Sequence, residues 1–142
     1  MRLQVLLSAM NLKNEGYIDT LHITSDAVVV NQTGRPEMEK DKAQGPQDGS
    51  GEILSIERIK RENTRGDRQE VVFIESSERG LSRSRNMAIA NASADICILC
   101  DNDVEYRDGY ERIILDAFEK NKNADLIVFF IKRKERNAPI FS

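Results

Sequence analysis

Residues 95–103 read DICILCDND, an apolar run with acidic residues at both ends. A short apolar run with polar flanks predicts a strand that is buried inside a sheet. This run ends in Asp101 and Asp103, which form the only Asp-x-Asp of the chain. Side chains two positions apart on an extended chain face the same side, so the two carboxylates repel each other unless a cation or a proton lies between them. The stretch therefore predicts a buried strand that carries a carboxylate pair at its end.

Other apolar runs predict further strands over residues 3–8, 27–30, 71–74 and 126–131. The intervening segments predict helices over residues 11–22, 52–63 and 82–91, and a last helix that begins after Asp108. Ser82 is expected to be an N-cap, and Asp108 with Glu111 is expected to form an Asp variant of the capping box. The alternation of short strands with helices predicts an α/β fold with three layers, α/β/α, and a mostly parallel sheet.

The composition is that of an ordinary soluble protein, with 39% hydrophobic and 32% charged residues, and the length fits a single domain over residues 1–142. A net charge of −3 gives no electrostatic reason to expect a nucleic-acid partner. No apolar run approaches the ~20 residues that span a bilayer, and the N-terminus lacks the long apolar segment of a signal peptide. We therefore expect a cytoplasmic protein. Residues 33–51, rich in Gly, Pro and charged side chains, predict a long flexible loop.

Cys97 and Cys100 have the C-x-x-C spacing of some metal and redox sites. On a strand, however, residues three apart point to opposite faces, so the two thiols would diverge. We expect both to be small buried hydrophobic residues. His22 is the only histidine, and we expect it to be structural or solvated.

A parallel sheet binds its ligands beyond the carboxyl ends of its strands. These ends bring to one edge residues 8–11, 31–32, 75–82 and 101–103. Gly80 and Ser82 lie at a predicted helix N-terminus, where free backbone N–H groups favour an anion. Arg85 either binds a phosphate or packs its stem along the sheet, and both interpretations stay open. The carboxylate pair suits Mg²⁺ or Mn²⁺, ions that one or two carboxylates hold together with substrate phosphates.

Two common nucleotide-binding fingerprints are missing from the chain. There is no G-x-G-x-x-G after the first predicted strand and no G-x-x-x-x-G-K-[ST]. Their absence from the sequence argues against a dinucleotide-dependent oxidoreductase and against a P-loop NTPase.

Residues 78–92, ERGLSRSRNMAIANA, together with residues 95–103 resemble family 2 glycosyltransferases of the GT-A fold. The family pattern is G-x-S-x-[AS]-R-N-x-[GA]-I, a short spacer, and a hydrophobic strand that ends in D-x-D. The similarity extends over residues 71–106. A weaker similarity covers the first two predicted strands, where residues 8–11 (SAMN) stand in place of the family's P-x-Y-N.

The resemblance implies a Rossmann-like GT-A half-domain that binds a nucleotide-diphosphate sugar, a UDP- or GDP-sugar, for transfer to a saccharide acceptor. Asp103 would bind the Mg²⁺ or Mn²⁺ ion that bridges the diphosphate, and Asp101 would face the ribose or the waters of that metal. Such a metal neutralises the leaving nucleoside diphosphate. The donor-binding residues that the resemblance and the strand ends imply are Ser8, Asn11, Asn31, Gln32, Gly80, Ser82, Arg85, Asp101 and Asn102. By the same resemblance, the acceptor is a growing bacterial surface polysaccharide, which implies peripheral work at the inner membrane face.

Two departures from the family pattern limit this interpretation. Asn31 and Gln32 stand where the family has an acidic pair that reads the nucleobase, so the identity of the base stays open. Residues 104–142 contain no recognisable catalytic base. The catalytic residues are therefore unknown, and we expect the chain to hold mainly the donor-binding half of such an enzyme, in a truncated or unusually short form.

Two alternatives of other classes remain. Without a visible base, the chain would serve as a non-catalytic module that binds nucleotide sugars. Residues 96–104 also fit the h-h-h-h-D-x-D-x-[TV] motif of haloacid-dehalogenase-like phosphatases, with Asp101 as the nucleophile and Asp103 as the general acid. That motif belongs on the first strand of its domain, whereas here several predicted strands precede it.

Overall fold

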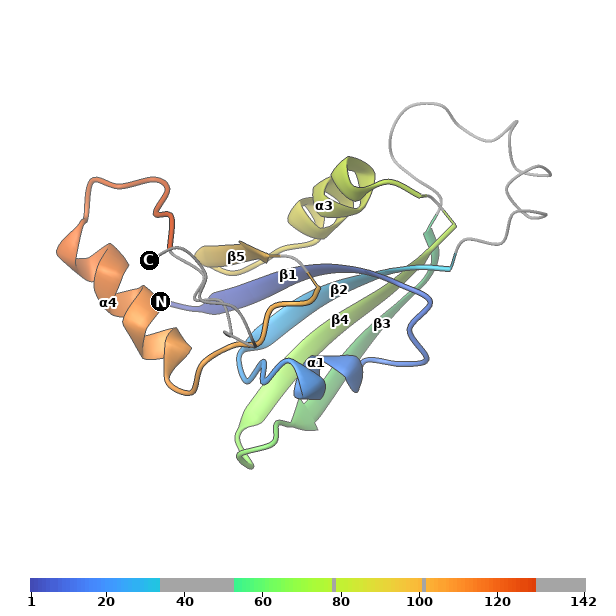
Figure 1. The fold of residues 1–142 in the computed structure, drawn as a ribbon, viewed down its shortest axis with the longest axis horizontal. Helices are drawn as coiled ribbons and strands as arrows, with labels where there is room; N and C mark the ends of the chain where they lie inside the picture. The colour runs from blue at the N-terminus through green and yellow to red at the C-terminus, as the bar shows by residue number, and fades with distance from the viewer. Residues whose placement is uncertain (34–52, 78, 101, 130–142) are drawn as a thin grey trace, which may run out of the picture.

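A mostly parallel sheet forms the centre of the computed structural model, which describes residues 1–33, 53–77, 79–100 and 102–129 (Figure 1). Within these residues, five strands lie in the order β3-β4-β2-β1-β5. β1 pairs in parallel with β2 and β5, β2 pairs in parallel with β4, and β3 is antiparallel to β4. The elements are β1 (Leu3–Met10), α1 (Tyr17–Thr20), β2 (Asp26–Gln32), β3 (Ile53–Glu62), β4 (Arg68–Ser76), α3 (Leu81–Ala90), β5 (Ile96–Cys100) and α4 (Tyr110–Lys120).

Helices cover both faces of the sheet, so the predicted three-layer α/β/α fold is confirmed (Figure 1). In the described residues, α1 and α4 pack on one face and α3 packs on the other. Alternate residues of a strand point to opposite faces, so each central strand serves two cores. Val5 and Val29 pack towards α1 and α4, whereas Leu6 and Val28 pack towards α3. Cover on both faces explains why these strands are apolar at nearly every position.

The segment expected as a helix over residues 52–63 is instead the edge strand β3, so that prediction is wrong. Its isoleucines recur every third residue, which resembles one face of a helix. The chain reverses directly after them, where the Asn63 side chain accepts two backbone hydrogen bonds and Gly66 takes a φ of 84°. This hairpin lays β3 against the apolar strand β4. Pairing across the hairpin then decides the conformation, because β-branched residues fit a pleated surface.

The helix expected over residues 11–22 is reduced to the four residues of α1. Asn11 and His22 take positive φ values of 53° and 60°, which interrupt helical geometry on both sides. Gly16 further lowers the helix propensity of the segment. A helix of one turn is not stable on its own, so contacts with the rest of the protein hold it in place.

The strand expected over residues 126–131 is not seen in the described part of the chain. Residues 126–129 have no regular structure, and Leu126 and Val128 are 81% and 84% exposed. Residues 130–131 lie outside the described residues. A strand needs a neighbour for its backbone groups, and no strand of the described sheet pairs with residues 126–129. Apolar composition alone therefore does not make residues 126–129 a strand.

Both predicted helix caps are wrong. Gly80 and Gly109, at φ values of 127° and 82°, are the N-caps of α3 and α4, and no side chain caps either helix in the described structure. Asp108 instead forms an ion pair with Arg65 at 3.1 Å. Glu111 accepts a hydrogen bond from the Thr24 hydroxyl at 3.2 Å. Asp108 and Glu111 therefore contact residues far away in the sequence instead of capping the start of α4.

β5 is buried on one face only, which corrects the expectation of a fully buried strand. Ile96 packs into the core, but Cys97 and Leu99 are exposed on the opposite face. The reason is that β5 lies at the edge of the described sheet, while α3 packs over β1 and β2. The two cysteines do point apart as predicted and are not joined by a disulfide, but only Cys100 is partly buried. Partial desolvation raises the pKa of the Cys97 thiol, which disfavours the thiolate that a metal or redox site needs.

The loop expected over residues 33–51 lies outside the described residues, apart from Thr33. The Thr33 N–H donates to the Ser76 carbonyl at 3.0 Å, which continues the pairing of β2 with β4 by one residue. No helix in the described residues is long and apolar enough to cross a membrane.

Tyr110 anchors α4 to the sheet, and its hydroxyl is a point at which the fold can be tested. The Ser25 N–H donates to this hydroxyl at 2.9 Å, and the Ser25 and Tyr110 hydroxyls lie 2.6 Å apart. Tyr110→Phe leaves these buried groups unpaired, so we expect the free energy of unfolding to fall by about 1–3 kcal/mol. Urea denaturation measures the change. Ile113→Ala, at an exposed position of the same helix, is the control and should cost within about 0.5 kcal/mol; equal effects of the two changes would contradict the anchor.

Candidate functional site

The four parallel strands end on one side of the sheet, and we call this side the carboxyl edge (Figure 1). β1 ends at Met10, β2 at Gln32, β4 at Ser76 and β5 at Cys100. The first turn of α3 is tied to the same edge, because the Gly80 N–H donates to the Gln32 side chain at 2.8 Å. The segments that the sequence assigns to a site are therefore brought together.

Gln32 links three elements at the carboxyl edge. Its side chain is 5% exposed and faces α3. The amide oxygen accepts from Gly80, and the amide nitrogen donates to the Ser8 hydroxyl at 3.3 Å. The Ser8 hydroxyl is also hydrogen-bonded to the hydroxyl of Ser84 in α3. Gln32 and Ser8 thus hold the α3 turn against β1 and β2, and their predicted contact with a donor stays a prediction.

Asn31 faces the other side of the sheet from Gln32, because adjacent strand residues alternate. Its side chain is fully buried and bonds both backbone groups of Leu12, at 2.9 Å to the N–H and 3.0 Å to the carbonyl. This clamp fixes the chain directly after Asn11. Asn11 itself is exposed at the edge, and its N–H donates to the Gln32 carbonyl at 3.0 Å. Of these two asparagines, Asn11 is exposed and Asn31 is not, so a ligand can reach only Asn11 without a rearrangement.

The first turn of α3 offers the anion-binding features that the sequence predicts. Gly80 and Ser82 are exposed. Gly80 is the N-cap, no side-chain cap is seen on this turn in the described structure, and the Gly80 N–H itself is taken by Gln32. The start of a helix favours an anion through its dipole. Arg85 is half-buried and engaged in contacts within the protein. Its two interpretations, phosphate ligand or packed stem, both stay open.

Asp101, Asn102 and Asp103, which we call the acidic turn, follow β5 in the sequence at the carboxyl edge. Asp101 lies outside the described residues, whereas Asn102 and Asp103 are exposed directly after it. No group of three or more His, Cys, Asp or Glu residues in the described chain forms a metal cage. The side chains of the acidic turn therefore do not fit a metal site whose ligands all come from the protein. They do fit Mg²⁺ or Mn²⁺, which often bind one or two carboxylates and take their other ligands from water and substrate phosphates.

Loop residues after the acidic turn pack back onto α1. The Tyr106 N–H donates to the Leu21 carbonyl at 2.7 Å, and the Tyr106 ring lies 4.9 Å from that of Tyr110. The Tyr106 hydroxyl is buried without a hydrogen-bond partner in the described residues. Burial, with a smaller contribution from the nearby Cys100 thiol, raises the pKa of Tyr106. This hydroxyl is therefore neutral at physiological pH.

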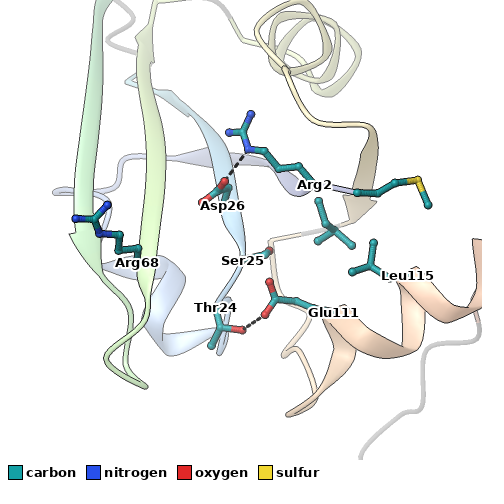
Figure 2. A pocket seen from close by; sticks show the side chains of 9 residues that line it. Arg2, Thr24, Ser25, Asp26, Arg68, Glu111 and Leu115 are labelled. Carbon is teal, nitrogen blue, oxygen red and sulfur yellow. Dashed lines mark hydrogen bonds and ion pairs between the residues drawn. The ribbon is translucent and has the colours of Figure 1, made fainter.

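A hollow at the opposite end of the strands is lined by charged side chains (Figure 2). There Arg2 and Asp26 form an ion pair at 2.8 Å, and this contact raises the pKa of Arg2. Thr24 donates to Glu111 across the same hollow. These groups pair with each other, and ligands of parallel sheets bind at the carboxyl ends instead. We therefore place the candidate site at the carboxyl edge.

Two further residues of this edge escaped the sequence analysis as site residues. Ser84, which contacts Ser8, matches a small position of the quoted motif, so its spacing carried a signal. Tyr17 donates its hydroxyl to the carbonyl of Asn102 at 2.7 Å. No pattern in the sequence joins these two positions, which lie 85 residues apart.

Replacing Gln32 tests the framework of the site. Gln32→Leu keeps the volume of the side chain but removes both hydrogen bonds, so we expect the free energy of unfolding to fall by about 1–3 kcal/mol. The Gly80 amide should also exchange its hydrogen faster, because its acceptor is lost. Asn86→Ala, at an exposed position of α3, is the control and should change stability by less than about 0.5 kcal/mol. Unchanged exchange at Gly80 in the Leu variant would contradict the proposed link.

Comparison with known protein families gives one match. The model of the family described as glycosyl transferase family 2 matches residues 44–141, which is more than half of the chain. The matched range includes α3, β5 and the acidic turn. Searches of curated proteins and of solved structures found no significant match.

Proposed function

The chain belongs to glycosyl transferase family 2, and we propose that its carboxyl edge binds a nucleotide-diphosphate sugar through a divalent metal at the 101–103 turn. The family implies a sugar donor and an acceptor in general. For this chain we propose a UDP- or GDP-sugar as the donor, Mg²⁺ or Mn²⁺ as the metal, and a saccharide as the acceptor.

The observation that carries the proposal is the position of Asp103. This exposed carboxylate follows β5 at the edge where Gln32 ties down the start of α3. A divalent ion at Asp103 would have its remaining positions free for phosphate oxygens. A second anion-binding element, the first turn of α3, lies at the same edge. Both features favour a ligand with several negative charges, as a diphosphate has.

The same arrangement supports departure of the nucleoside diphosphate. As the bond between sugar and phosphate breaks, negative charge develops on the diphosphate. A bound Mg²⁺ or Mn²⁺ stabilises that charge when present. The chain's own contribution is to hold Asp103 and the α3 turn at one edge, so that little reorganisation is needed. We place the nucleoside next to the exposed side chain of Asn11 at the carboxyl edge.

Asp103→Ala is the direct test of the metal site. We expect binding of UDP and GDP in the presence of Mn²⁺ to be lost, because the ion loses its carboxylate ligand. Isothermal titration calorimetry with and without EDTA measures the metal-dependent part. Stability should change by less than about 0.5 kcal/mol, since Asp103 is exposed.

Asp95→Asn is the matched control for this test. Asp95 is also exposed and lies next to the other end of β5, where its carboxylate accepts the Arg2 N–H at 2.8 Å. Asparagine keeps an acceptor for that bond, so metal-dependent binding should be retained. Wild-type protein that binds neither UDP nor GDP with Mn²⁺ would rule out the proposed donor site.

Turnover separates the transferase from the other classes. Incubation of the protein with UDP- or GDP-sugars and Mn²⁺ should release the nucleoside diphosphate, which coupled detection of UDP or GDP measures. Binding without release would indicate a module that only holds the donor. Release of phosphate from a model phosphoester, lost in Asp101→Asn, would instead indicate a phosphatase.

A further inference from the structure

We infer that Tyr17 is a positioning residue for the acidic turn. Its hydroxyl donates a hydrogen bond to the Asn102 carbonyl and so holds the backbone of the turn. The distance from the Tyr17 hydroxyl to that carbonyl oxygen is 2.7 Å. Asn102 directly precedes Asp103, and both lie in the turn that follows β5. The inference rests on the proposed function of this turn and assigns a task to a residue outside it.

The acceptor is a backbone group, and this decides what the bond can do. A peptide unit is planar, so fixing the Asn102 carbonyl also fixes the N–H of Asp103 in the same plane. The direction in which the Asp103 side chain leaves the backbone is restricted as a consequence. The bond leaves both carboxylate oxygens of Asp103 unused. Tyr17 therefore orients a ligand of the metal without being a ligand itself.

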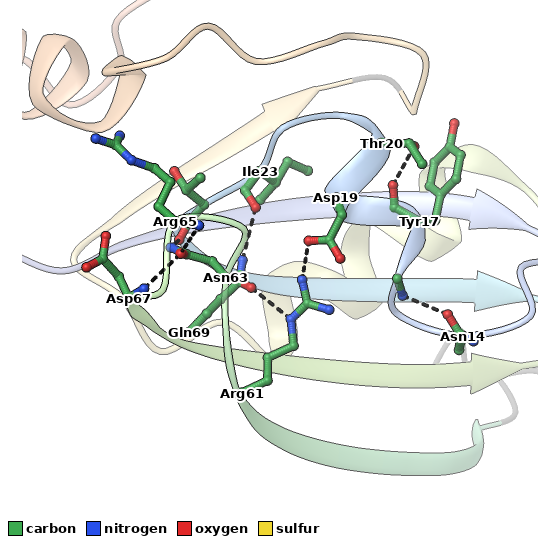
Figure 3. Close-up of polar contacts among 12 residues, drawn as sticks. Asn14, Tyr17, Asp19, Thr20, Ile23, Arg61, Asn63, Arg65, Asp67 and Gln69 are labelled. Carbon is green, nitrogen blue, oxygen red and sulfur yellow. Dashed lines mark hydrogen bonds and ion pairs between the residues drawn. The ribbon is translucent and has the colours of Figure 1, made fainter.

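Tyr17 can do this because α1 is held at several points (Figure 3). Ile18 is fully buried in the core beside it. Asp19 forms a part-buried ion pair with Arg61 of β3. The Thr20 hydroxyl donates to the Tyr17 carbonyl at 2.6 Å. These contacts supply the rigidity that a helix of four residues lacks on its own.

Arg61 of β3 links α1 to the sheet. Its guanidinium also donates to the Gln69 side chain at 2.9 Å. The Gln69 amide, which is 2% exposed, donates in turn to the carbonyls of Ile23 and Ser25 at 3.1 and 2.7 Å. Polar contacts therefore tie β3 and β4 to α1 at Asp19, two residues from Tyr17 in the same helix. Figure 3 shows these contacts.

The expected benefit is in metal affinity. An exposed turn that is ordered only when the metal binds costs conformational entropy at that moment. A turn that is already held avoids part of this cost. One ordinary hydrogen bond accounts for roughly a threefold to tenfold change in a dissociation constant. Loss of the Tyr17 hydroxyl should weaken metal-dependent binding by that factor.

The three tyrosines of the chain provide a matched experiment. Tyr17→Phe removes the hydroxyl that bonds Asn102 and keeps the ring. Tyr106→Phe removes a buried hydroxyl whose neighbour is the weakly hydrogen-bonding Cys100 thiol, so it should leave binding unchanged. Calorimetry with UDP and with GDP, each at a series of Mn²⁺ concentrations, measures the metal dependence. We expect Tyr17→Phe alone to require about threefold to tenfold more Mn²⁺ for half-maximal binding.

Hydrogen exchange of the ligand-free protein gives a second readout. Amides of residues 102–104 should exchange faster in Tyr17→Phe, while the central amides of β1 and β2 stay protected. Unchanged exchange at residues 102–104, or equal Mn²⁺ dependence of the wild type and Tyr17→Phe, would overturn the inference and leave the donor site standing. Equal weakening by Tyr17→Phe and Tyr106→Phe would also overturn it. Wild-type protein that binds neither nucleotide would instead overturn the proposed function, and the inference with it.

Discussion

Parallel pairing of strands that are buried on both faces is the constraint on which the rest of this structure depends. β1 and β2 pair along their whole length, and β4 and β5 extend the pairing on either side. The chain passes from β1 to β2 through α1 and from β4 to β5 through α3, and these two helices cover opposite faces of the sheet. The same connections bring every parallel strand to its carboxyl end at one edge. Residues far apart in the sequence, such as Gln32 and Gly80, meet there for this reason.

Buried polar side chains at the ends of the strands fix the conformation of the loops that follow or precede them. Asn31 and Gln32 do so at the carboxyl edge, and Ser25 and Gln69 do so at the opposite edge. Each bonds the backbone or side chain of a neighbouring segment, and a partner left unpaired in these buried positions is costly. The irregular segments are therefore held by specific contacts as well as by apolar packing. The Tyr17 contact extends the same principle to the acidic turn.

Local patterns predicted the parts of this protein that local physics decides. The apolar runs of β1, β2, β4 and β5 and the helix α3 lie where the sequence places them. The prediction over residues 52–63 failed because pairing across a hairpin overrode an ambiguous spacing. Asp103 and Gly80 lie at the predicted edge, but the amide of Gln32 is engaged within the protein. The contact of Tyr17 with Asn102 could not be predicted, since only the assembled sheet brings the two together.

The central claim, that the metal-bound diphosphate lies at the carboxyl edge, is tested most directly by nuclear magnetic resonance with paramagnetic Mn²⁺. Amide resonances are recorded for the protein with UDP or GDP as Mn²⁺ is added, and signals close to the ion broaden. Our account predicts selective broadening at residues 102–104 and in the first turn of α3. Broadening centred on Arg2 and Glu111 at the opposite edge, or none that depends on the nucleotide, would contradict it.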